Sequence, residues 1–257
     1  MVLSYAFCSV PLMPVRSEPS HRAEMVTELL FGEKMEVLEI NDNDWARIHC
    51  AWDDYIGWCK IGQLRLTTIR EYRKEVKFIA DKHHNRLIVK SGDIILPMGS
   101  NLFGLKLLYP DEVKYKGKKK LWQDLELTPK HLLDAAMQYM NAPYRWGGRS
   151  ILGIDCSGLT QMAFKMCGKA IRRDAAQQAV EGELVDFLQH AHKGDLAFFD
   201  NAEGKITHVG ILVDNTHILH ATDTSGHVVI DKIDAEGIVS ISLKKRTHKL
   251  RMIRRYM

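Results

Sequence analysis

The sequence predicts an α+β protein in which two small all-β barrels precede a domain with helices first and an antiparallel sheet after. Short runs of nearly alternating hydrophobicity, separated by turn residues, fill residues 1–127. The composition changes at residue 128, where helix signals first appear, and strand-like runs return later in the chain. We therefore expect domains at 1–66, 67–127 and 128–257, which a chain of 257 residues is long enough to fold.

Residues 1–66 contain the runs MEVLEIN and WARIHCA, joined by the turn NDND, and then YIGWCKI. The segments VRSEPSHRAEMVTELLFGE, VLEINDNDWARIH and YIGWCKIGQL together resemble a bacterial SH3-like domain, which implies a small barrel. Its interior is expected to hold three tryptophans and three cysteines: Trp45, Trp52, Trp58, Cys8, Cys50 and Cys59.

Residues 67–127 are also rich in strand patterns, with VKFIA, RLIVKSGDIILPMGS and GLKLLYP between turn residues. Helix signals are few, which favours a second, more divergent SH3-like barrel. KYKGKKK at 114–120 is interpreted as a basic, hairpin-like, solvated turn rather than an anion-binding patch.

Two helices are predicted in residues 128–257. Thr128 is a helix N-cap with Pro129 at the first helical position. A second, amphipathic helix is expected from Cys156 to near Gly168. The runs GDLAFFD, THVGILVD, THILHAT and VVIDKI then read as strands, and the basic tail KKRTHKLRMIRRYM as a final strand rather than a nucleic-acid site.

The stretch GIDCSGLT places Cys156 where the second helix begins. A helix N-terminus lowers the pKa of a thiol, because unpaired backbone N–H groups favour negative charge there. Adjacent strands can bring His208 and His220 together beside the thiol, as a cysteine nucleophile requires. The alternatives are a small core cysteine, and a zinc site formed by His208, His217 and His220.

The blocks Y-R-W-G-G, D-C-S-G-L-T, R-D-A-A-Q-Q, K-G-D-L-A-F-F, T-H-V-G-I and H-I-L-H-A resemble the NlpC-type cell-wall peptidases over roughly residues 129–225. The resemblance implies a papain-like fold and hydrolysis of the γ-D-glutamyl to diamino-acid bond of murein peptides. It implies Cys156 as nucleophile, His208 as base, His220 as the residue that orients His208, and Tyr144 as a stabiliser of the oxyanion.

Two SH3-like domains before the peptidase resemble a narrower subgroup that acts on murein peptides with a free N-terminal L-alanine and releases L-Ala-γ-D-Glu. The resemblance implies that Asp155 pairs with the substrate ammonium. It implies further pocket residues at Trp146, Tyr144 and Ser157, with Tyr55 and Glu24 of the first barrel closing the far side. The chain departs from the subgroup at Ala175, where serine is common, so a hydroxyl contact is not expected there.

The composition limits the other classes. A net charge of +4 does not require a nucleic-acid partner, and no apolar run approaches the roughly 20 residues of a membrane span. Five cysteines without CxxC spacing favour a reducing compartment over a disulfide framework. We expect a cytoplasmic monomer that needs no cofactor or metal and binds murein-derived peptides, with export after loss of a signal peptide as the alternative.

Two rival functions fit the same residues. One is a papain-like amidase or acyltransferase that acts on intact murein. The other is a non-catalytic wall-binding protein whose barrels hold glycan or peptide. Products formed from defined murein peptides distinguish the first, and the alkylation rate of the thiol distinguishes the second.

Overall fold

The computed structural model describes residues 1–257. The chain divides into an N-terminal unit, Met1–Leu125, and a C-terminal unit, Glu126–Met257. None of the helices is both long and apolar enough to cross a lipid bilayer.

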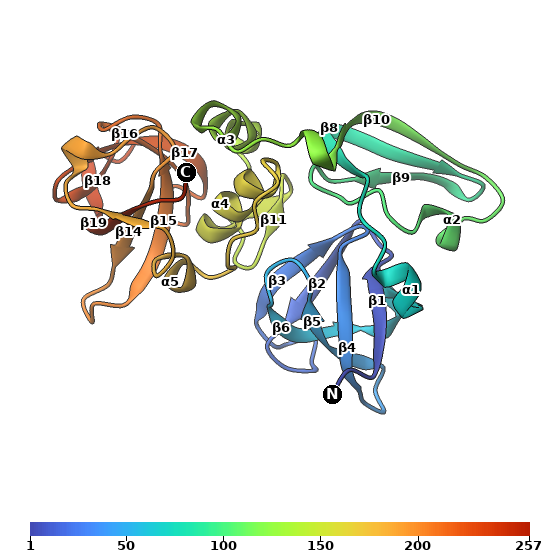
Figure 1. The fold of residues 1–257 in the computed structure, drawn as a ribbon. Coiled ribbons are helices and arrows are strands. Elements are labelled where there is room, and N and C mark those ends of the chain that lie inside the picture. The colour runs from blue at the N-terminus through green and yellow to red at the C-terminus, as the bar shows by residue number, and fades with distance from the viewer. The chain divides into compact units, whose positions relative to one another are not determined.

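The N-terminal unit begins with a seven-stranded antiparallel sheet in the order β3-β2-β6-β5-β4-β1-β7, drawn in blue in Figure 1. The predicted runs MEVLEIN and WARIHCA form two of its strands and pair directly with each other. The strands are β1 (Ser4–Cys8), β2 (Leu12–Arg16), β3 (Met25–Leu30), β4 (Lys34–Ile40), β5 (Trp45–Cys50), β6 (Ile56–Lys60) and β7 (Leu64–Thr67).

The core of this barrel is built from aliphatic side chains, methionines and the three predicted cysteines. The expectation that tryptophans fill the interior is wrong for Trp52 and Trp58, which are only half-buried. Trp45 is buried but lies outside the main apolar cluster, and its ring packs against His21. Alternating small and aliphatic residues already fill so small an interior, which leaves no volume for three indoles.

Residues 67–125 form a three-stranded sheet in the order β10-β8-β9, made of β8 (Phe78–Val89), β9 (Gly92–Leu96) and β10 (Val113–Leu121). Two short helices, α1 (Ile69–Tyr72) and α2 (Leu105–Leu108), accompany it. Phe31, at the end of β3, packs into the core of this sheet. A separate second SH3-like barrel therefore stays a prediction.

Two local predictions in this segment are wrong. GLKLLYP contains the helix α2, which begins after Gly104 in a left-handed conformation at φ 72°. KYKGKKK is not a turn but part of the strand β10, whose register against β8 shifts between Lys116 and Lys118. The extra residues of this bulge lie in β8, where residues 82–85 stand opposite the single Gly117, and Lys82 and His84 have positive φ.

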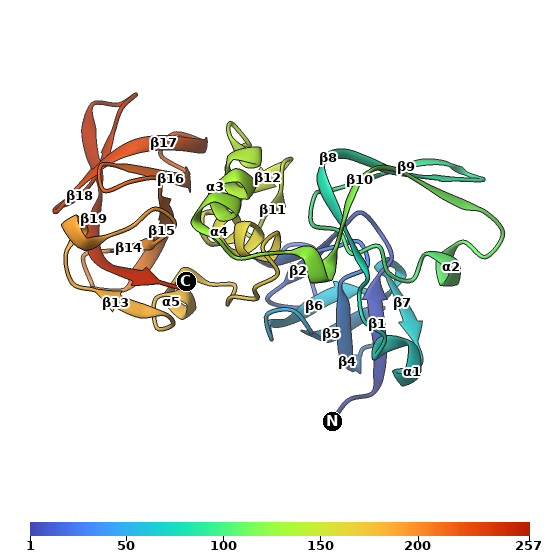
Figure 2. The same ribbon diagram turned by 45° about the horizontal axis from the view of Figure 1, so that its top comes forward.

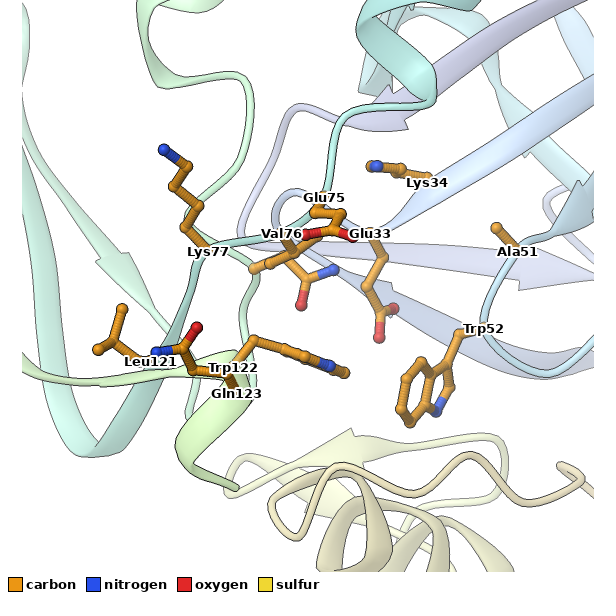
Figure 3. Close-up of a pocket in the computed structure, with 11 residues that line it drawn as sticks. Glu33, Lys34, Ala51, Trp52, Glu75, Val76, Lys77, Leu121, Trp122 and Gln123 are labelled. Carbon is orange, nitrogen blue, oxygen red and sulfur yellow. The ribbon is translucent and has the colours of Figure 1, made fainter. Parts of the chain in front are cut away.

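A cavity of about 660 Å³ opens in the N-terminal unit between the barrel and the segment that follows it. Its walls carry the indoles of Trp52 and Trp122, which meet edge to face, and the side chains of Glu33 and Glu75, as Figure 3 shows. This accounts for the position of Trp52, which turns outward from the barrel to line the cavity.

The C-terminal unit starts with helices, as predicted. Helix α3 (Pro129–Ala136) is capped by Thr128, whose hydroxyl accepts the N–H of His131. The strands β11 (Arg149–Ser150) and β12 (Gly153–Ile154) form a hairpin, and α4 (Cys156–Lys165) and α5 (Ala175–Gln178) follow. Figures 1 and 2 show α3 and α4 on the same side of the sheet that follows.

That sheet has the order β13-β19-β14-β15-β16-β17-β18, and β18 also pairs with β19, so β14 to β19 close on themselves. All the predicted strand runs lie in it, including the basic tail. The strands are β13 (Glu183–Val185), β14 (Leu196–Asp200), β15 (Ile206–Leu212), β16 (His217–Thr222), β17 (His227–Asp234), β18 (Gly237–Ser240) and β19 (Lys245–Arg255). Leu212, Ile218 and Ile233 lie in the apolar cluster inside the closed sheet.

Helix α4 packs against β15 and β16. The prediction of an amphipathic helix is wrong here, because all ten residues of α4 are buried. The helix therefore runs through the interior of the unit, which holds its N-terminus, and the thiol there, in a fixed position.

Candidate active site

Cys156 is the first residue of α4, with Asp155 as its N-cap. The thiol is 5% exposed, and the backbone N–H groups of Val209 on β15 and of Ser157 lie within hydrogen-bonding reach of its sulfur. The nucleophile candidate is thus at the helix start that the sequence predicts, against the strand that carries His208.

The sequence around the thiol explains why the helix begins there. One oxygen of Asp155 accepts the N–H of Gly158 at 2.6 Å, and the other accepts the N–H of Gly147 at 2.8 Å. A Cβ on Gly158 would lie 2.3 Å from the carbonyl oxygen of Gly148, so only glycine fits at this crossing. The glycines of the two motifs therefore bring the loop and the helix start together.

The two predicted histidines contact each other. Nε2 of His208 on β15 lies 2.9 Å from Nδ1 of His220 on β16, and both rings are buried. Gly210 permits this approach, because a Cβ there would lie 3.0 Å from that of His220 and 2.7 Å from Cδ1 of Ile218. The histidine pair therefore requires the glycine of the T-H-V-G-I block, because a larger residue would not fit there.

Two further side chains, which the sequence analysis missed, complete the surroundings of the pair. Nε2 of His220 lies 3.3 Å from a carboxylate oxygen of the buried Asp231 on β17. The ring of His248 on β19 stacks on that of His208 with centroids 4.1 Å apart. Asp231 could have been recognised because it is an acid inside the apolar run VVIDKI. No feature of the charged tail distinguishes His248 as a site residue.

The zinc alternative does not match this geometry. His217 hydrogen-bonds to Asp214 at the start of β16, while His220 points to His208 and Asp231. No group of three His, Cys, Asp or Glu side chains comes together as a metal site in the structure.

Burial dominates the protonation of the site. It raises the pKa of Cys156 to about 12, and Asp155 adds to the rise, while the Val209 N–H, Arg173 and the Ser157 N–H oppose it. Burial also lowers the pKa of His208 well below its usual value, with His220 and His248 contributing. The pKa of this thiol therefore lies above its usual value, contrary to the lowering expected from the helix N-terminus. These directions leave Cys156 a thiol and His208 a neutral imidazole at neutral pH, so a base must remove the thiol proton during attack.

Asp155 already has a cationic partner in the structure, the guanidinium of Arg173. The two groups are joined by contacts of 2.6 and 3.1 Å, and a further nitrogen contact of Arg173 reaches the Ser157 hydroxyl at 2.8 Å. All three side chains are buried. Asp155 therefore has a cationic partner beside the thiol even without a substrate ammonium. The R-D block was the signal for Arg173.

Comparisons with known proteins match two parts of the chain to family models. Residues 141–247 match the NlpC/P60 family model, and residues 15–64 match the model of the bacterial dipeptidyl-peptidase SH3 domain. The chain carries an NlpC/P60 cysteine peptidase domain. The proteins that it resembles are named dipeptidyl-peptidases and probable endopeptidases.

Similar proteins span most of the chain. Dipeptidyl-peptidase 6 of Lysinibacillus sphaericus is 28% identical over 248 residues, which is 86% of this chain and 88% of that protein. The gamma-D-glutamyl-L-lysine dipeptidyl-peptidase of Bacillus subtilis is 28% identical over 79% of this chain and 74% of its own length. An NlpC/P60 family protein from Bacillus cereus, solved by crystallography, shares the fold with a TM-score of 0.82 at 21% identity over 98% of this chain and 99% of its own.

The NlpC/P60 domain also positions the two aromatic candidates. Burial raises the pKa of Tyr144, and electrostatic interactions with Cys156 and Asp155 add to the rise, so the phenol keeps its proton as a hydrogen-bond donor. The Trp146 side chain is 57% exposed and follows in the same loop. Tyr144 is thus near the thiol, and Trp146 presents its ring at the surface.

The two barrel candidates belong to the N-terminal unit. Glu24 is exposed, and its carbonyl accepts the N–H of Ser17. The Tyr55 side chain packs against the barrel core. Neither residue lines the cavity shown in Figure 3. Their proposed place beside the peptidase site stays a prediction.

The buried histidines of the NlpC/P60 domain predict a pH dependence of stability. The folded-state pKa of His208 lies well below 6.5, and that of His248 falls to about 4, mainly through burial. Below pH 6.5 the unfolded chain binds these protons and the folded protein does not, so stability present above pH 6.5 is lost as the pH falls. Each histidine contributes a slope that approaches about 1.4 kcal/mol per pH unit.

Denaturant unfolding between pH 7.5 and 4.5 measures this slope. His248→Gln removes one of the two groups and should reduce the slope by about one proton. A free energy of unfolding that stays constant across this range would contradict the neutral, buried state of both rings.

Proposed function

We propose that the protein hydrolyses the γ-D-glutamyl to diamino-acid bond of murein peptides with a free N-terminal L-alanine and releases L-Ala-γ-D-Glu. The observation that carries the proposal is the Cys156 thiol at the start of α4, against the strand β15 that carries His208, together with the hydrogen bond between His208 and His220 of β16. The names of the dipeptidyl-peptidase relatives support the choice of bond.

In the proposed reaction the sulfur of Cys156 attacks the γ-carbonyl carbon of D-glutamate, and its proton passes to Nδ1 of His208. The Tyr144 hydroxyl donates to the oxyanion that forms. The imidazolium then protonates the nitrogen of the departing diamino acid, which leaves a thioester on Cys156. Water, deprotonated by His208, cleaves the thioester and restores the thiol.

Nδ1 is the nitrogen of His208 available for this step, because Nε2 faces His220. The low pKa of His208 and the high pKa of Cys156 support a neutral resting pair that transfers the proton only when substrate is bound. Activity should therefore have an acid limb below pH 6.5 and no alkaline limb near neutral pH.

Recognition of the substrate N-terminus is the finer part of the proposal. Asp155, Ser157, Tyr144 and Trp146 are proposed to line its pocket, with Tyr55 and Glu24 closing the far side. The interactions of Tyr144 with Cys156 and Asp155, and the contacts of Arg173 with both Asp155 and Ser157, support placing these residues in one pocket. The ion pair with Arg173 modifies this assignment, because the substrate ammonium must share the Asp155 carboxylate with a guanidinium.

Defined peptides test the proposed bond and terminus. We expect L-Ala-γ-D-Glu-L-Lys and its diaminopimelate counterpart to yield L-Ala-γ-D-Glu by mass spectrometry. The N-acetylated peptides should react at least about tenfold more slowly, because they lack the ammonium.

Release of the intact peptide from a muramyl conjugate would favour the amidase function instead. No product from any of these peptides, with a protein that stays folded and still binds them, would favour a wall-binding protein.

We also propose that residues 67–127 are a divergent second SH3-like barrel. The antiparallel sheet of β8, β9 and β10 supports it. Hydrogen exchange under partly denaturing conditions should then open 78–121 separately from 1–66. Opening of both segments in one step would assign them to a single folding unit.

A further inference from the structure

Asp231 is the far end of a buried chain of three side chains that leads to the proposed base. Its Oδ2 lies 3.3 Å from Nε2 of His220, and Nδ1 of His220 lies 2.9 Å from Nε2 of His208. The exposed fractions are 3% for Asp231, 0% for His220 and 6% for His208. Three successive strands, β15, β16 and β17, contribute one member each.

The other oxygen of Asp231 anchors it to the protein. Oδ1 accepts the backbone N–H of Ile241 at 2.7 Å, and the Ser240 hydroxyl also donates to the carboxylate. Burial raises the pKa of Asp231, but the hydrogen bonds from His220, Ile241 and Ser240 lower it by more, so its net pKa lies below the usual value. The side chain is therefore an ionised acceptor with no proton to donate.

An ionised acceptor decides where the neighbouring protons reside. His220 must carry its proton on Nε2 to donate to Asp231, which leaves a lone pair on Nδ1. That lone pair can accept only if His208 carries its proton on Nε2. The lone pair of His208 then lies on Nδ1, the nitrogen that the proposed mechanism uses to take the thiol proton.

We infer that Asp231 is a positioning residue that fixes the tautomers of His220 and His208 and so keeps His208 ready as a base. The inference rests on the proposed function, in which His208 removes the proton of Cys156. During that step the proton moves from sulfur to Nδ1 of His208, and Nε2–H continues to donate to His220. Asp231 stays ionised, and no proton travels along the chain.

The other titratable groups around the pair do not fix the tautomers. His248 stacks flat on His208 and presents no ring nitrogen to it along a hydrogen bond, and its Nδ1 contacts Thr247. Asp223 acts on His248 by its charge. The titratable groups that contact the two rings are thus Asp231 and His248, and of these only Asp231 hydrogen-bonds to His220.

Asp231→Asn tests the role of Asp231 in fixing the tautomers, because the hydrogen bond from the Ile241 N–H orients the new amide. The N–H of Ile241 requires the amide oxygen at the Oδ1 position, which places the NH₂ group against Nε2 of His220. Nε2 must then become the acceptor, so the proton of His220 moves to Nδ1. His208 in turn must accept on Nε2 and carry its proton on Nδ1, where it cannot take a proton from the thiol.

We expect kcat of Asp231→Asn to fall about 100-fold at pH 7, with KM within about twofold. This is less than the roughly 10⁴-fold loss typical of replacing an acid bonded directly to a catalytic histidine, because one imidazole intervenes. The loss should shrink as the pH rises, since hydroxide removes the thiol proton without the base. A loss caused by misfolding would not depend on pH in this way.

Nitrogen-15 NMR of the histidine rings gives a readout independent of activity. In the wild type His220 should carry its proton on Nε2, and in Asp231→Asn on Nδ1. The matched control is Asp234→Asn on the same strand, which removes the same charge from an exposed pair with Arg246 and should change neither the tautomers nor kcat.

A wild-type His220 protonated on Nδ1 overturns the inference, even if the variant does not fold. So does a variant with inverted tautomers and wild-type kcat. Failure of the proposed function is separate, because it appears as a wild type that releases no L-Ala-γ-D-Glu while the tautomers still follow Asp231.

Discussion

Cys156→Ala is expected to reduce hydrolysis of murein peptides to the background rate while the protein stays folded. The thiol is the nucleophile of the proposed reaction, and alanine cannot form the thioester. The sulfur is buried at the start of α4, so its removal leaves a small cavity and costs about 1 kcal/mol. The helix start does not depend on the sulfur, since Asp155 caps it through the N–H of Gly158.

Cys167→Ala is the matched control for this loss. Cys167 lies two residues beyond the end of α4 and is 3% exposed, so the same atom is removed from a comparably buried place. We expect full kcat for Cys167→Ala and no product for Cys156→Ala, measured with the same tripeptide. Retention of most activity by Cys156→Ala would exclude a covalent mechanism at this residue.

The helices and strands around the candidate active site could be predicted because each is marked by a pattern of neighbouring residues. Thr128-Pro129 marks α3 through an N-cap and a proline at the first position. Asp155 marks the start of α4 in the same way. The alternating runs that contain His208 and His220 predicted the two strands that carry them. These strands are neighbours in the sheet, which places the two rings in contact.

The partners of these residues were missed because they depend on long-range packing. Arg173 reaches Asp155 across 18 positions, and Asp231 reaches His220 from the next strand. The burial of α4 on every side also follows from the sheet and helices around it, which a helical period does not reveal. That burial reversed the expected protonation of Cys156, since desolvation outweighs the helix terminus.

Asp155→Asn should have the second large effect, on both stability and specificity. Asp155 accepts two guanidinium contacts from Arg173, and both side chains are almost wholly buried. Asparagine can keep the N–H of Gly158 on its oxygen. In the wild type, Gly147 and Arg173 both donate to Oδ2 of Asp155. In the variant an NH₂ group, itself a donor, would stand at that position and could accept neither hydrogen bond. Leaving a buried charge without its partner typically costs about 3–5 kcal/mol of unfolding free energy.

A second substitution separates this structural cost from substrate recognition. In Asp155→Asn/Arg173→Met the unpaired guanidinium is gone, and a buried ion pair replaced by neutral side chains is often tolerated. We expect the double variant to regain more than half of the stability that Asp155→Asn loses, measured by denaturant unfolding. The charge that the substrate ammonium would meet remains absent in both variants.

The specificity test therefore uses the ratio of kcat/KM for free and N-acetylated peptides in all three proteins. If Asp155 binds the ammonium, truncating that pair costs about 2–5 kcal/mol on the free peptide alone. The ratio should then fall at least tenfold, and it should stay low in the double variant although stability returns. Equal losses on both peptides, restored by Arg173→Met, would assign Asp155 to the helix start and its ion pair. The preference for a free N-terminal alanine would then need another carboxylate.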